Sequence, residues 1–179
     1  MARMFVLLVG LGLLTPAVGQ GQSVEKQIAD AIAALPPTMR DGATVIAYDG
    51  DAEGTILRRG TNDMICWADE PTPGFYVACF HKVKEPYEVR RREFRVVQAA
   101  PNWRELIDDA IDAGEVSMPD VAIRYELQGN RREVALPLSV VHIPYATPES
   151  TGLSTEPDNY RPWLMLPGTP RAHIMLPGQ

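Results

Sequence analysis

The chain has few of the residues and spacings that mark a known chemistry. Its 179 residues include only two cysteines and three histidines. It has no HExxH, GxSxG, phosphate-loop or dinucleotide-binding spacing, so the best-marked hydrolase and nucleotide-binding classes are excluded. After residue 19 no long apolar run remains, so we expect no stable membrane insertion once that segment is removed.

Positive charge is scarce as well. The chain carries 17 lysines and arginines against 23 aspartates and glutamates, a formal net charge of −6. Contacts to phosphate supply most of the affinity of nucleic-acid-binding proteins, so nucleic acid is not an expected partner. One basic cluster stands out, with arginines at positions 90–92 and at Arg95. Because Glu88 and Glu93 lie among these arginines, we predict a solvated helix face on which opposite charges pair.

What the chain does have is an N-terminal segment of the kind that directs export. Arg3 gives a positive start, residues 5–14 form an apolar run, and Ala17 and Gly19 supply small residues before a cleavage point. The run is too short to span a membrane as a helix. We therefore predict that residues 1–19 are a removable signal peptide and that the protein is exported, to the periplasm or out of the cell.

Export decides how Cys66 and Cys79 are interpreted. Outside the cytoplasm two cysteines favour one structural disulfide, and their spacing is wrong for a redox CxxC pair. A bridge closing this loop of about 14 residues is worth about 3 kcal/mol in the chain-entropy model. Metal ligation or free thiols are the alternatives.

The periodicity of apolar residues predicts a mixed order of helices and strands. Helices are expected at residues 23–35, with Ser23 as N-cap, and at 87–99 and 102–113. Strands are expected at 43–48, 55–59, 64–68, 75–81, 121–127, 133–143, 163–166 and 173–176. We predict an α+β fold, a mainly antiparallel sheet with helices packed on one face. The single domain would span residues 43–179, after an N-terminal helix and linker over residues 20–42.

Two local signals refine this prediction. Asn102 and Glu105 have the spacing of a capping box, with asparagine in place of the usual serine or threonine. Residues 121–127 alternate between an apolar set and a set that contains Arg124 and Glu126. Such alternation is typical of a half-buried antiparallel hairpin, so Arg124 is expected on the face turned away from the core.

Several segments together resemble those of a group of small exported bacterial proteins of uncharacterised activity. The segments are residues 57–62 (LRRGTN) followed by Cys66, 142–147 (HIPYAT), 162–165 (PWLM) and 168–175 (GTPRAHIM). The resemblance covers about residues 43–177 and implies export and a single domain. It implies no activity, ligand or catalytic residue for this chain.

The three histidines, His81, His142 and His173, are the main candidates for metal chemistry. Each lies on or beside a predicted strand, so strands of one sheet could bring them together as a zinc-like catalytic centre with an open position. The opposing interpretation is three separate structural histidines, and we predict no bound metal. Met165 and Met175 beside His173 would suit Cu(I), although such methionines ordinarily fill a core.

Aromatic and polar residues near the C-terminus are candidates for a ligand pocket, since pockets combine aromatic walls with a few polar groups. The predicted ligand-binding residues are His142, Tyr145, Trp163, Thr169 and His173. We therefore favour an exported binding or interaction domain without a cofactor. Its partner would be an unknown small molecule or an envelope protein. The alternative is a small metal-dependent enzyme that uses the histidine cluster.

Overall fold

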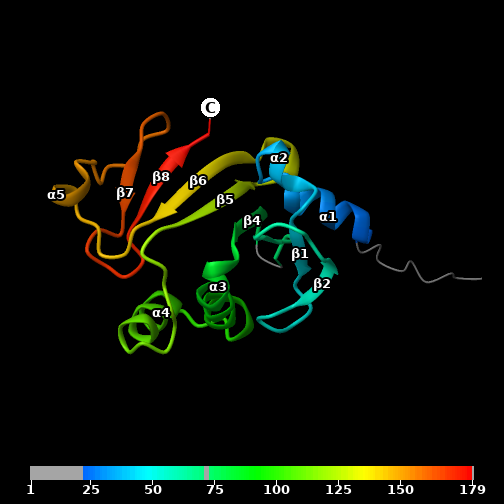
Figure 1. Cartoon of the computed structure of the whole chain (residues 1–179), viewed down its shortest axis with the longest axis horizontal. Helices are drawn as coiled ribbons and strands as arrows, with labels where there is room; N and C mark the ends of the chain where they lie inside the picture. The colour runs from blue at the N-terminus through cyan, green and yellow to red at the C-terminus, as the bar shows by residue number, and fades with distance from the viewer. Residues whose placement is uncertain (1–21, 71–72, 179) are drawn as a thin grey trace, which may run out of the picture.

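A computed structural model describes residues 22–70 and 73–178 of the chain, which build one eight-stranded sheet with helices against it (Figure 1). The helices are α1 (Val24–Ile32), α2 (Pro37–Arg40), α3 (Glu85–Arg92), α4 (Trp103–Asp112) and α5 (Pro148–Thr151). The strands are β1 (Thr44–Ala47), β2 (Thr55–Arg58), β3 (Met64–Trp67), β4 (Phe75–His81), β5 (Ala122–Gly129), β6 (Leu136–His142), β7 (Trp163–Met165) and β8 (His173–Pro177). The predicted signal peptide lies outside the described residues.

The sheet has the strand order β2-β1-β3-β4-β5-β6-β8-β7. The β1–β3 pair is parallel, and the other neighbouring pairs are antiparallel. This arrangement confirms the predicted α+β fold with a mainly antiparallel sheet. Across residues 22–70 and 73–178, no helix has the length and apolarity needed to cross a membrane.

Helices cover both faces of the sheet near β1, β3 and β4, so the prediction of helices on one face is corrected (Figure 1). Helix α1 packs over the side chains of Val45 and Cys66. Val89 of α3 packs over Ile65 and Phe80, which point to the opposite face. The physical reason is visible in β3, whose four residues are all buried although successive side chains point to opposite faces.

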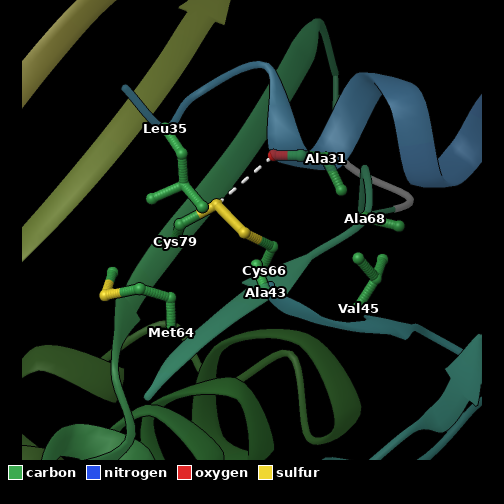
Figure 2. Packing of buried hydrophobic residues seen from close by; sticks show 8 residues of the cluster. All are labelled: Ala31, Leu35, Ala43, Val45, Met64, Cys66, Ala68 and Cys79. Carbon is green, nitrogen blue, oxygen red and sulfur yellow. Dashed lines mark hydrogen bonds between the residues drawn. A yellow bond between two sulfur atoms is a disulfide. The ribbon is translucent and has the colours of Figure 1, made fainter. Parts of the chain in front are cut away.

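The α1 face holds an apolar core that is crossed by a disulfide (Figure 2). Cys66 of β3 and Cys79 of β4 are direct cross-strand partners and form the predicted bridge. Ala31 and Leu35 lie over it, and both are buried. The predicted N-terminal helix therefore packs on the sheet as part of the domain. Ser23 caps α1 as predicted, because its side chain accepts from the backbone N–H of the third helical residue.

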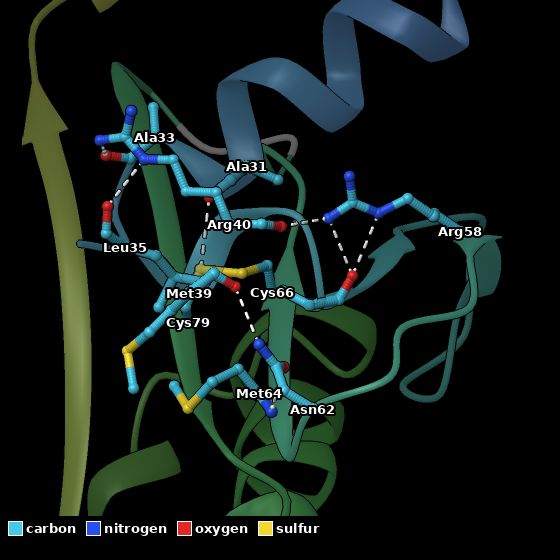
Figure 3. The surroundings of a disulfide bond; sticks show 11 residues. Ala31, Ala33, Leu35, Met39, Arg40, Arg58, Asn62, Met64, Cys66 and Cys79 are labelled. Carbon is cyan, nitrogen blue, oxygen red and sulfur yellow. Dashed lines mark hydrogen bonds between the residues drawn. A yellow bond between two sulfur atoms is a disulfide. The ribbon is translucent and has the colours of Figure 1, made fainter. Parts of the chain in front are cut away.

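Two arginines hold the chain that leaves α1 against the sheet (Figure 3). Arg40 donates to the backbone carbonyl oxygens of Ala33 and Leu35. Arg58 of β2 donates in turn to the carbonyl oxygens of Arg40 and Ala43. The bond to Ala33 satisfies a carbonyl group that the end of α1 leaves without an intrahelical partner, and the others tie down the chain that follows. They also fix the position of α1 over the disulfide.

The helical region after β4 differs in detail from the prediction. Residues 87–99 were expected to form one α-helix, and instead α3 continues into a π-helix, η2 (Glu93–Val97). Helix α4 is present, but the predicted cap by Asn102 is wrong, since its side chain makes no capping hydrogen bond. The backbone of Asn102 has φ −100° and ψ 26°, which is not the extended conformation of an N-cap residue.

Candidate functional site

A groove of about 740 Å³ lies on the α3 face of the sheet, between α3, the start of α4 and strands β4 to β8. Aromatic and apolar side chains form much of its wall, including Tyr76, Trp103 and Val140. Its charged lining residues are Arg91, Arg95, Arg104, Arg124, Arg171 and Glu126. The groove therefore presents five guanidinium groups and one carboxylate in a protein whose formal net charge is −6.

The basic cluster that the sequence predicted to be solvated is instead largely buried. Arg91 is 5% exposed and Arg92 is 0% exposed. Glu88 and Arg91 are three residues apart and Arg95 follows four residues later, so all three share one face of the helical segment. The helix turns this face toward the sheet, because it has few apolar side chains to present in its place. The prediction of a solvated face is therefore wrong.

Glu88 is the centre of this buried charge cluster. Lys84 Nζ lies 3.0 Å from Glu88 Oε1, and Arg91 Nε lies 2.9 Å from Glu88 Oε2. Arg124 of β5 donates through Nη1 to both carboxylate oxygens at 3.0 Å. Complete burial alone would raise the pKa of Glu88, but the three cations, Arg124 foremost, hold it well below its usual range. Glu88 is therefore a carboxylate enclosed by three cations.

Arg124 connects the cluster to the groove. Its side chain is 4% exposed, so the expectation that it points away from the core is corrected. Arg124 Nε lies 2.9 Å from Glu126 Oε1, and Nη2 donates to the hydroxyl of Tyr76. The Tyr76 hydroxyl donates to Glu126 Oε1 at 3.0 Å. Burial raises the pKa of Tyr76, which therefore stays protonated and keeps this donor.

A second group of buried and half-buried charges includes Arg95, which lines the groove. Glu70 is buried between Arg92, whose Nε lies 3.2 Å from Oε1, and Arg95, whose Nη2 lies 3.2 Å from Oε2. The Arg92 guanidinium stands 3.4 Å from the centre of the Trp67 ring, and that of Arg95 stands 5.5 Å from the Tyr76 ring. Contacts with aromatic rings therefore help to hold both guanidinium groups in place.

Some buried donors in this region are not used within the described chain. Arg91 Nη2 is buried and, among residues 22–70 and 73–178, has no hydrogen-bond partner. Neither ring nitrogen of His142 has a partner there, although this side chain is 4% exposed. An unmade hydrogen bond of a buried polar group is costly, and natural structures keep few of them. Both residues line the groove, so a molecule bound there could satisfy them.

His142 and His173 are cross-strand partners on β6 and β8, with ring centroids 5.0 Å apart. His173 Nδ1 lies 2.7 Å from the backbone carbonyl oxygen of Arg171. A carbonyl oxygen can only accept, so Nδ1 carries the proton and Nε2 keeps a lone pair. Burial lowers the pKa of both histidines, well below the usual value for His142. Both imidazoles are therefore neutral at neutral pH.

The other predicted ligand residues do not line this groove. The Tyr145 hydroxyl donates to Asp112 Oδ1 at 2.7 Å, and the ring borders a separate depression beside the end of α4. Thr169 donates through Oγ1 to the carbonyl oxygen of Leu166 and accepts from the backbone N–H of Arg171. Thr169 thus shapes the turn before Arg171. Trp163 of β7 is half-buried and lies outside the groove lining.

The third histidine lies apart from the pair. His81 is the last residue of β4, and its Nδ1 accepts from the backbone N–H of Val83 at 3.2 Å. Phe80 pairs in register with Arg124 on the groove face, so alternation places His81 on the other face of the sheet. Within the described part of the chain, no group of three histidine, cysteine, aspartate or glutamate side chains is positioned to hold a metal ion.

Sequence reasoning found the histidine pair and missed the arginines. A signal for the arginines does exist in the segment from Lys84 to Arg95. A helix that covers a sheet needs a buried stripe, and this segment offers charged residues at positions three and four apart with few apolar ones beside them. Such a helix can be buried only if its charges pair with charges on the sheet. Arg124 and Glu126 on the polar side of β5 were the available partners.

Comparisons of the chain with protein-family models, curated proteins and solved structures give no match. The resemblance to small exported bacterial proteins therefore stays a prediction. Function has to be inferred from the geometry and charge of the groove. Three features bear on that inference: a surplus of guanidinium groups, buried donors without partners in the described residues, and apolar walls around them.

Proposed function

We propose that the protein is an exported binding domain whose groove holds a small organic anion through a carboxylate or phosphate group. The observation that carries this proposal is the lining of five arginines against one glutamate, with a buried guanidinium nitrogen of Arg91 left without a partner in the described chain. Guanidinium groups bind the oxygens of carboxylates and phosphates through paired hydrogen bonds.

The charge balance around the groove favours an anion. The buried or half-buried cations are Lys84, Arg91, Arg92, Arg95, Arg124 and Arg171, and the carboxylates that contact them are Glu70, Glu88, Glu126 and Asp108. The cations outnumber the carboxylates by two. Charge in a concave region with low-dielectric walls attracts a counter-charge more strongly than the same charge on an open surface. An anionic ligand would neutralise the surplus.

The arginines are already held in place before a ligand arrives. Arg171 pairs with Asp108 at 2.6 Å, and its guanidinium stands 5.7 Å from the Trp103 ring. Arg95 is held by Glu70 and by the face of Tyr76. Binding then orders few additional side chains, and this reduces the entropy cost that usually weakens polar ligands.

The walls of the groove indicate an apolar body on the anion. Trp103 and Val140 contribute apolar surface next to the arginines, and Tyr76 contributes an aromatic face. Bare inorganic anions would leave this surface in contact with water. An anion that carries an aromatic or aliphatic group would cover it and gain hydrophobic stabilisation.

Several observations support action outside the cytoplasm. The Cys66–Cys79 disulfide is buried beneath α1, and such bridges persist in oxidising compartments. The N-terminal sequence pattern and the resemblance to exported bacterial proteins are consistent with this location. The alternative, a metal-dependent enzyme built on three histidines, has less support because His81 lies on the other face of the sheet.

Calorimetric titration at low ionic strength tests the proposed function with three probes: phenyl phosphate, benzoate and inorganic phosphate. We expect the two organic anions to bind more tightly than inorganic phosphate, since only they cover the apolar wall. Arg95→Gln removes one charge-assisted hydrogen bond, so it should weaken phenyl phosphate binding about tenfold. Added salt should weaken binding further, because Arg95 is partly exposed.

Arg161→Gln is the matched control for this experiment. Arg161 is an exposed arginine paired with Asp158, and it lies outside the groove lining. This change removes the same charge from the protein without touching the groove, so phenyl phosphate binding should be unchanged. If none of the three probes binds at millimolar concentration, or if both variants weaken binding equally, the groove is not an anion site.

A further inference from the structure

The end of the groove nearest β7 carries a row of nitrogen and sulfur donors. His142 of β6 pairs in register with His173 of β8, and His173 pairs in register with Met165 of β7. Directly paired residues point to the same face of a sheet. Met175 follows His173 by two residues, so its side chain points to that face as well. All four residues line the groove.

Both histidines present nitrogen atoms that are free to bind a metal. The carbonyl oxygen of Arg171 fixes the proton of His173 on Nδ1, and this leaves the lone pair on Nε2. Metal-binding histidines commonly use this arrangement, in which one ring N–H donates to a backbone carbonyl and the other nitrogen binds. His142 is buried, faces the groove, and has no hydrogen-bond partner for either nitrogen in the described chain.

The distance between the rings fits a shared ion. A nitrogen–metal bond of about 2.0 Å places the metal about 3.2 Å from the centre of an imidazole ring. Two ring centres at that distance from one ion lie 5.0 Å apart, as observed here, when they subtend about 105° at the metal. That angle is close to tetrahedral and leaves positions for further ligands.

We propose that His142, His173 and Met165, with Met175 as a further thioether donor, form a Cu(I) site. Thioether sulfur and imidazole nitrogen are ligands that suit Cu(I), and methionine is a poor ligand for magnesium or calcium. Met165 is 37% exposed, so it does not fill the core as such methionines ordinarily do. Its side chain lines the groove.

The surrounding charges favour a monovalent ion over a divalent one. Arg124 and Arg171 line the same groove as His142, and their positive charges would repel a bound dication more strongly than Cu(I). Glu88 and Glu126 are the carboxylates in this neighbourhood. Glu88 is already enclosed by three cations, and Glu126 is paired with Arg124. The site therefore offers neutral donors for an ion of low charge. It uses two of the three histidines and does not depend on the anion proposed above.

Competition for Cu(I) with bicinchoninate under nitrogen, with ascorbate as reductant, tests the site. The protein should remove one Cu(I) per chain from the chelator. X-ray absorption of the complex should show two nitrogen and at least one sulfur neighbour. Cys66 and Cys79 cannot supply that sulfur as thiolates, because both are held in the disulfide. His173→Ala and Met165→Leu should each weaken Cu(I) binding on the order of tenfold or more.

His81→Asn provides the matched control, since it removes a histidine from the other face of the sheet and asparagine can still cap the following turn. It should leave Cu(I) binding unchanged, and so should Arg95→Gln, which tests the anion groove separately. No transfer of Cu(I) from bicinchoninate to the native protein would overturn the proposal. A complex without sulfur neighbours, or an equal loss in His81→Asn, would overturn it as well.

Discussion

The two faces of the sheet hold different interiors, since the α3 face adds buried charges to an apolar cluster around Ile65 and Phe80. On the α1 face, Cys66 and Cys79 lie in an apolar core and form a disulfide. On the α3 face, strand residues such as Arg124 meet the buried charges of a helix. Apolar burial stabilises a fold wherever it occurs, whereas buried charges do so only when every partner is in place. The α1 face therefore relies on apolar burial, and the α3 face combines buried charges with the groove proposed to bind an anion.

The two faces should also differ in how well they tolerate substitutions. An apolar core accepts many side chains of similar volume. The Glu88 cluster should tolerate few substitutions, because each of its cations is positioned by the same carboxylate. Moving Glu88 would also displace Arg91 and Arg124, both of which line the groove. A change at Glu88 is thus expected to alter both stability and the proposed anion binding, whereas a change in the α1 core should alter stability alone.

The largest effect is expected from Glu88→Gln, which removes the central charge and keeps the side-chain shape. Lys84, Arg91 and Arg124 would remain buried without their shared carboxylate. Breaking a buried ion pair in this way costs about 3–5 kcal/mol, to be measured as the free energy of unfolding in urea. Adding Lys84→Met should recover part of the loss, since one unpaired cation is removed. A loss below about 1 kcal/mol for Glu88→Gln alone would contradict the central role of this carboxylate.

The next effect comes from the α1 face, where the double change Cys66→Ala and Cys79→Ala removes the disulfide. We expect the free energy of unfolding to fall by about 3 kcal/mol, because the unfolded chain has more conformational entropy without the cross-link. Phenyl phosphate binding should persist in the folded variant, since the bridge lies on the face opposite the groove. Urea unfolding and calorimetry check the two statements. Loss of binding with retained folding would show that the two faces are not separable.

A smaller effect is expected from pH through Lys84. Burial lowers its pKa to about 8, against 10.5 for a free lysine. Between these values the unfolded chain binds more protons than the folded one. The free energy of unfolding therefore increases as the pH rises. The gain should be about 2 kcal/mol between pH 8 and pH 10.

Lys84→Met isolates this contribution. Burial raises the pKa of Tyr87 to about 12, and this favours the unfolded state as the pH approaches 10, in the variant as in the native protein. The difference in unfolding free energy between the two proteins therefore reports Lys84 alone. A difference that stays constant from pH 8 to pH 10 would mean that the pKa of Lys84 is not depressed.

The sequence was sufficient to predict most individual elements of the fold. Strand β4 was expected at residues 75–81, where it is found, because its apolar run stands between clear turn signals. The parallel pairing of β1 with β3 was not predicted, since local patterns locate strands without telling which ones become neighbours. The packing of helices on both faces follows from that pairing, so it was not predicted either.

The candidate site was only partly predictable, for a different reason. His142 and His173 were found because rare side chains on strands are conspicuous, and the sheet brings them together. Tyr145 was grouped with them, yet its backbone has φ +61°, and the turn there carries its ring away to the end of α4. Arg91 and Arg124 were predicted to be exposed, because an interpretation based on hydrophobic periodicity places charged residues on the solvent-facing side. Their burial depends on partners far apart in the sequence.

The smallest effect is expected where an ion pair lies in water. Lys82 Nζ lies 2.9 Å from Asp63 Oδ1, a contact similar in length to those around Glu88, and both side chains are exposed. Solvent screening and side-chain entropy cancel most of the value of such a pair, so Asp63→Asn should leave the midpoint of urea unfolding within experimental error. A loss as large as that of Glu88→Gln would show that burial is not what distinguishes the α3 face from the protein surface.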